Sequence, residues 1–108
     1  MRELIWVGSL RLDMLRCEVI TPDKMAHLTP LEMWLLGYLA APERVNTTVS
    51  AGQISAALWD DASSAPSALI KVFIHHIQRK IEQGPMHPLY LLRLPGEGFK
   101  LVISRERS

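Results

Sequence analysis

The chain has 108 residues, of which 48% are hydrophobic and 21% charged, and this composition is typical of a globular protein. It is too short for two separate cores, so we expect one domain over residues 1–108. No apolar run approaches the ~20 residues of a membrane span, and no basic-then-apolar leader opens the chain. A lone cysteine, Cys17, excludes an internal disulfide, so we expect a reducing, cytoplasmic compartment.

Positive charge is concentrated in the second half of the chain. Residues 1–61 contain five Lys/Arg and eight Asp/Glu, whereas residues 62–96 contain four Lys/Arg and a single glutamate. The net charge of the whole chain is only +1. A basic region on a near-neutral chain is typical of a nucleic-acid-binding face.

The first part of the chain, residues 1–28, has the pattern of short β-strands. Apolar and polar residues alternate with a period of two, and the runs are separated by turn residues such as Pro22-Asp23-Lys24. We expect a small antiparallel sheet. Its predicted strands cover residues 4–7, 10–14, 17–21 and 25–28.

A capping signal predicts the first helix. Thr29 can cap it, Pro30 fits its first position, and Glu32 is placed to complete a capping box. The helix should end near Ala41, because Pro42 stops it. Leu28 and Met33 are candidates for a hydrophobic staple, and the side chains expected to be buried are Leu31, Leu35, Tyr38 and Leu39.

A second capping box, formed by Ser50 and Gln53, predicts a helix that ends at Trp59. Ile54 and Leu58 would supply its buried face. Small and acidic residues at positions 60–66 then form a loop before the next helix. Two helices in this order resemble a helix-turn-helix with a long turn.

The third helix, over residues 67–83, has two distinct faces at about 100° per residue. One face is an apolar stripe of Ile70, Ile74, Ile77 and Ile81, with Phe73 beside it. The opposite face carries Ala68, Val72, His75, His76 and Arg79, with Lys71 and Lys80 on the flanks. A helix in the DNA major groove needs a small apolar group for a thymine methyl, donors for base edges and cations for phosphates. The alternative is a surface helix whose basic side has no function.

The last part of the chain, residues 89–103, predicts a β-hairpin. Strands over 89–94 and 99–103 flank Pro95-Gly96-Glu97-Gly98, in which both glycines tolerate positive φ. Arg93 and Lys100 lie near its tip. A hairpin directly after a recognition helix is the wing of a winged helix. We therefore predict an α+β winged helix-turn-helix, with an N-terminal sheet in 1–28, three helices in 29–83 and the wing in 89–103.

These stretches together resemble the C-terminal DNA-binding effector domain of the OmpR/PhoB class of bacterial response regulators. The resemblance covers nearly the whole chain, and it rests on the order and spacing of several short motifs. The matching segments are Leu28-Thr29-Pro30-Leu31-Glu32, Pro42-Glu43-Arg44-Val45, Ser50 to Trp59, Ile70 to Ile81 and Gly96-Glu97-Gly98-Phe99-Lys100-Leu101.

The resemblance implies a sequence-specific, double-stranded DNA-binding transcriptional regulator with its third helix in the major groove. It also implies contact between the 60–66 loop and RNA polymerase, and a homodimer on DNA. The DNA-binding residues that it suggests are Ser50, Trp59, Lys71, Val72, His75, His76, Arg79, Lys80, Arg93 and Lys100. For Trp59, a role as a core anchor is an equal alternative.

The chain departs from the family pattern at several positions. His75-His76 and Gln78 stand where the family often has arginines, and Pro95 replaces an arginine before the wing glycines. We expect these changes to weaken phosphate contacts. No receiver domain is present in the 108 residues, so phosphorylation would not be the switch if the chain is the full product.

Other chemistry has little support in the sequence. His75 and His76 point about 100° apart on a helix, so they do not share a metal as residues at i and i+4 do. We expect no metal, no cofactor and no catalytic site. The main alternative function is a winged-helix module that binds RNA polymerase or another regulator, which the exposed Val72 and the acidic Asp60-Asp61 would suit.

Overall fold

The computed structural model describes residues 4–59, 67–82 and 89–102. Within these ranges the chain forms an antiparallel sheet, then three helices, then a hairpin, as predicted. The elements are β1 (Leu4–Val7), β2 (Leu10–Asp13), β3 (Glu18–Ile20), β4 (Met25–His27), α1 (Pro30–Ala40), α2 (Ala51–Trp59), α3 (Ser67–Ile81), β5 (Leu91–Leu94) and β6 (Gly98–Leu101).

The N-terminal sheet has the strand order β1-β2-β3-β4, with every neighbouring pair antiparallel. Its register places Val7 opposite Leu10 and Leu12 opposite Val19, and all four side chains are buried. Alternation therefore gives the sheet one apolar face toward the core. The predicted strands are confirmed to within a residue or two.

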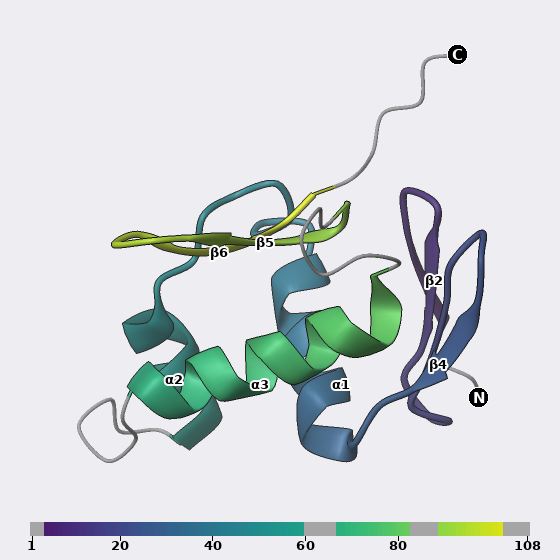
Figure 1. Ribbon diagram of the computed structural model, residues 1–108, viewed down its shortest axis with the longest axis horizontal. Helices are drawn as coiled ribbons and strands as arrows, with labels where there is room; N and C mark the ends of the chain where they lie inside the picture. Colours follow the sequence, from purple (N-terminus) through teal and green to yellow (C-terminus); the bar gives the residue numbers. More distant parts are fainter. Residues whose placement is uncertain (1–3, 60–66, 83–88, 103–108) are drawn as a thin grey trace.

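The helices form the middle of the molecule (Figure 1). The N-terminal sheet stands at one end of them, where β4 contacts α3, and α2 packs against α3 at the other end. The β5–β6 hairpin, which we call the wing, extends along one side of the helices, and β6 contacts α1.

The capping box predicted for α1 is present. The Thr29 hydroxyl accepts from the Glu32 amide at 3.2 Å, and the Glu32 carboxylate accepts from the Thr29 amide at 2.9 Å. Leu35 and Leu39 are buried as predicted, and both staple residues belong to the buried core. The prediction that Leu31 and Tyr38 are buried was wrong, since both side chains are only partly buried. They lie at the edges of the inward face of α1. That inward face includes Met33, Leu36 and Ala40.

The second capping box is also confirmed, with Gln53 and Ser50 exchanging bonds of 3.1 and 3.3 Å. Ile54 is buried, but Leu58 is only partly buried and Ser55 takes an inward position instead. In α3, all four isoleucines of the predicted stripe are buried, whereas Phe73 is half-buried. The helix ends at Ile81, earlier than predicted, and Gln83 lies outside the described residues.

The wing differs from its prediction at its start. The first strand begins at Leu91 rather than Leu89, because the Glu82 carboxylate accepts hydrogen bonds from the amides of Leu89, Tyr90 and Leu91. The second strand ends at Leu101. Ile103, the last residue of the predicted strand, lies outside the described residues.

Candidate nucleic-acid interface

The outward face of α3 carries the side chains that the sequence predicted there. Lys71, Val72, His75, His76 and Arg79 are all exposed, and Val72 exposes 45% of its surface. Four buried isoleucines on the opposite side fix the rotation of the helix about its axis. An exposed apolar residue among imidazoles and cations is therefore a consequence of the packing, and no described part of the chain covers it.

Gln78 does not belong to this face. Its side chain is buried, and its amide nitrogen donates a 2.8 Å hydrogen bond to the carbonyl of Leu91 in the wing. The expectation that a glutamine here weakens phosphate contacts stays a prediction. The residue joins α3 to the wing.

Lys80 lies at the edge of α3 that faces α1. Its ammonium is 2.7 Å from the buried carboxylate of Glu32, and the His76 imidazole is 3.9 Å from the same carboxylate. Burial alone would raise the pKa of Glu32. Hydrogen bonds from Lys80 and Thr29, together with the charge of Lys80, outweigh burial and hold this pKa below its ordinary value. A phosphate role for Lys80 stays a prediction, and the ion pair argues against it.

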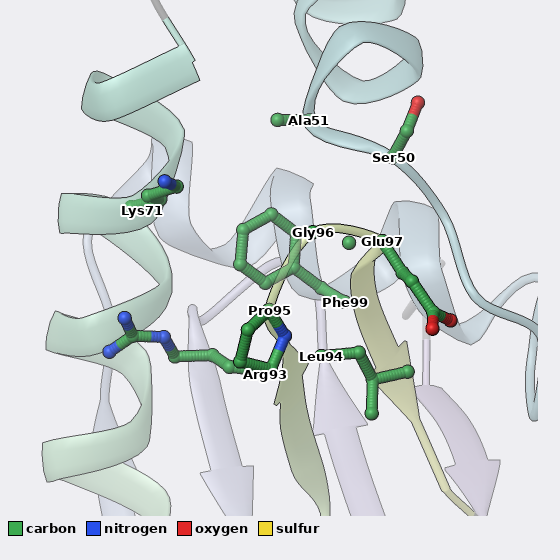
Figure 2. A pocket seen from close by; sticks show the side chains of 10 residues that line it. Ser50, Ala51, Lys71, Arg93, Leu94, Pro95, Gly96, Glu97 and Phe99 are labelled. Atoms are coloured by element: carbon green, nitrogen blue, oxygen red, sulfur yellow. The ribbon is translucent and has the colours of Figure 1, made fainter.

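The opposite edge of α3 borders a cavity of about 370 Å³ between the helices and the wing. Figure 2 shows Arg93 extending from β5 toward α3, on which Lys71 lies, while Ser50 and Ala51 mark the start of α2. The ring of Phe99 and the turn Pro95–Gly98 complete the wall. Three separate elements thus meet around one open space.

The charges around this cavity favour an anion. Lys71 and Arg93 contribute two cations, and no ion pair involves either of them within the described ranges. The first amides of α2 add a partial positive charge, as at any helix N-terminus. Glu97 is the one acid among the lining residues, and it lies in the wing turn. The set suits a phosphate group.

The wing is held beside α2 by backbone contacts. Val49 and Phe99 exchange two amide–carbonyl bonds of 2.8 and 2.9 Å. Gly98 has φ of +146°, and a Cβ there would clash with the backbone of Val49. A glycine is therefore required at this position.

The remaining predicted residues are not brought to the cavity. Lys100 follows Phe99 in β6, so its side chain points to the other face of the wing, and it does not line the cavity. Trp59 is the last residue of α2, and its role stays a prediction. The 60–66 loop lies outside the described residues. Sequence reasoning missed Glu82, although it is the one acid within residues 67–82.

Three helices with a wing that follows the third define the class of winged helix-turn-helix domains. Residues 23–101 match the family model described as "Transcriptional regulatory protein, C terminal". The chain belongs to this family, the OmpR/PhoB-type DNA-binding domains of transcriptional regulators, as the sequence motifs predicted.

Similar curated proteins include the DNA-binding dual master transcriptional regulator RpaA of Synechocystis and the regulatory protein KdpE of Mycobacterium tuberculosis. RpaA is 33% identical over 98% of the chain and 43% of its own length, and KdpE is 29% identical over 90% and 42%. The chain thus spans about two-fifths of the length of these relatives.

Solved structures of similar fold include the response regulator DrrB of Thermotoga maritima, an OmpR/PhoB homologue. It is 25% identical, with a TM-score of 0.76 over 92% of this chain and 44% of DrrB. The DNA-binding domain of Klebsiella pneumoniae RstA, solved with its RstA box, has a TM-score of 0.78 at 16% identity, over 94% of this chain and 99% of that domain. The second likeness concerns the fold alone.

The described ranges contain neither a membrane-spanning helix nor a metal-binding cluster. No helix there is long and apolar enough to cross a membrane. Among the same residues, no group of three or more His, Cys, Asp and Glu side chains is placed to hold a metal ion.

Proposed function

We propose that this domain regulates transcription by placing α3 in the major groove of double-stranded DNA and the wing on the adjacent backbone. The observation that carries this proposal is the meeting of Lys71, Arg93 and the start of α2 around one cavity beside the exposed face of α3. A helix with its side chains is about 10–12 Å across, and the major groove is about 12 Å wide, so the face would meet base edges.

The proposed roles follow from side-chain chemistry. Val72 would contact a thymine methyl, and His75, His76 and Arg79 would donate to base edges or phosphates. Lys71, Arg93 and the region of Ser50 would surround a backbone phosphate at the cavity. Arginine can bind a guanine edge or a phosphate with two hydrogen bonds, so Arg79 and Arg93 should contribute most.

Further parts of the proposal rest on the family resemblance. Trp59 and Lys100 would lie near the DNA backbone, and residues 60–66 would contact RNA polymerase. The domain would act in the cytoplasm, and two copies would bind neighbouring half-sites. The names of RpaA and KdpE, both transcriptional regulators, support a role of this kind.

Salt-dependent binding to a labelled mixed-sequence duplex, followed by fluorescence anisotropy, tests the proposal. Affinity should fall steeply with salt, because each neutralised phosphate releases counterions. Arg79→Ala should weaken binding by about 1–3 kcal/mol if Arg79 meets a base edge. The matched control is Arg16→Ala, an exposed arginine in the turn between β2 and β3. Absence of duplex binding by the wild-type domain at low salt would contradict the proposal.

A protein-binding role is the second candidate, and two exposed apolar side chains favour it. Leu69 and Val72 both lie at the surface of α3 and expose 38% and 45% of their area. An apolar face of this kind also suits a groove on a partner protein. Binding to RNA polymerase or another regulator with little salt dependence, and no duplex binding, would favour this function over DNA recognition.

A further inference from the structure

A buried carboxylate joins the end of α3 to the start of the wing. Glu82 exposes only 1% of its surface. One of its oxygens accepts from the Leu89 amide at 2.7 Å, and the other accepts from the amides of Tyr90 and Leu91 at 2.9 and 2.8 Å. Three successive amides converging on one carboxylate form a concave anion site within the chain itself.

Gln78 completes this connection one helical turn earlier. Its side-chain amide donates to the Leu91 carbonyl at 2.8 Å. Leu91 is therefore held through its C=O by Gln78 of α3 and through its N–H by Glu82, the residue directly after α3. The Glu82 amide bonds to the Gln78 carbonyl at 2.9 Å, which ties the two residues together. Lys24, in the turn between β3 and β4, donates a 3.0 Å hydrogen bond to the Glu82 carbonyl.

Arg93 lies close to this connection in the chain. Arg93 lies two residues beyond Leu91 in β5, a distance of about 6.6 Å along a strand. At the other side of the wing, the bonds between Val49 and Phe99 hold β6 to the start of α2. The wing is thus fixed to both helices that border the cavity, and Gln78 and Glu82 supply the bonds on the α3 side.

We infer that Glu82, assisted by Gln78, is a positioning residue for DNA binding: it fixes the wing against α3 and so holds Arg93 beside Lys71 at the cavity. Neither residue touches DNA in this scheme. The inference rests on the proposed function, since it assigns a task to Glu82 only if Arg93 contacts the DNA backbone.

The experiment is a double-mutant cycle between Glu82→Gln and Arg93→Ala, read as affinity for the labelled mixed-sequence duplex at low salt. Arg93→Ala should lose about tenfold in affinity, the value of one charge-assisted hydrogen bond, and about one unit of salt slope. Glu82→Gln should lose affinity in the same direction. In the double variant, Glu82→Gln should cause almost no loss of affinity beyond that caused by Arg93→Ala.

The direction of the change in duplex affinity distinguishes a positioning role of Glu82 from a purely electrostatic effect. Glu82→Gln removes a negative charge, so charge alone would tighten binding to an anionic duplex. Glu18→Gln, which removes a partly buried carboxylate from β3, is the matched control and should bind as tightly as the wild type or slightly tighter. Weaker binding by Glu82→Gln alone would therefore report the position of the wing.

Each outcome has one meaning. The inference is overturned if Glu82→Gln binds the duplex as tightly as the wild type or more tightly. It is also overturned if the losses of affinity in Glu82→Gln and Arg93→Ala add fully in the double variant. Both outcomes leave the proposed function intact. If Arg93→Ala itself binds normally, the wing assignment fails first and the inference fails with it. If circular dichroism shows that Glu82→Gln is unfolded, Gln78→Met, which removes only the bond to Leu91, is judged by the same criteria.

Discussion

The two edges of α3 carry the same type of residue in different surroundings. At the edge facing α1, Lys80 lies 2.7 Å from the buried Glu32 carboxylate, and its charge is balanced within the protein. At the edge facing the wing, Lys71 borders an open cavity together with Arg93. A cation that is already paired stabilises the fold, whereas one without a partner in the described residues is available to a ligand. Charge type alone therefore does not assign function on this helix.

Replacing Glu32 should have the largest effect on stability. Glu32→Ala removes a capping box and the partner of Lys80, and we expect it to lower the free energy of unfolding by about 2–3 kcal/mol. Glu32→Gln keeps the capping geometry, so it should cost less. Urea denaturation measures both. Glu43→Ala, at an exposed carboxylate, is the control and should stay within about 0.5 kcal/mol of the wild type.

The sequence predicted the scaffold well because its signals are local. Each of these signals acts over a few residues: the capping boxes at Thr29 and Ser50, the isoleucine stripe of α3 and the glycines of the wing. The pairing of Lys80 with Glu32 joins positions 48 residues apart, and nothing in the local pattern marks it. The same holds for Gln78, because its hydrogen-bond partner, the Leu91 carbonyl, lies 13 residues further along the chain in the wing.

Low pH should remove the stabilisation that the Glu32 carboxylate provides at the edge of α3 facing α1. The pKa of Glu32 is lower in the folded protein than its ordinary value of 4.5. Its contribution is therefore complete above about pH 4.5 and is lost as the pH falls through the folded-state pKa. Thermal unfolding should show a smaller loss of stability in acid for Glu32→Gln than for the wild type. Equal losses would show that other groups account for the acid sensitivity.

The most direct test of the contrast between the two edges of α3 compares Lys71→Met with Lys80→Met, since both remove one charge from the same helix. Duplex affinity would be measured by anisotropy over a series of salt concentrations at which both variants are folded. We predict that Lys71→Met lowers the salt slope by about one, while Lys80→Met leaves the slope unchanged and lowers stability by about 1 kcal/mol. An equal fall in slope for both variants, or a fall for Lys80→Met alone, would contradict the assignment of phosphate binding to the wing side of α3.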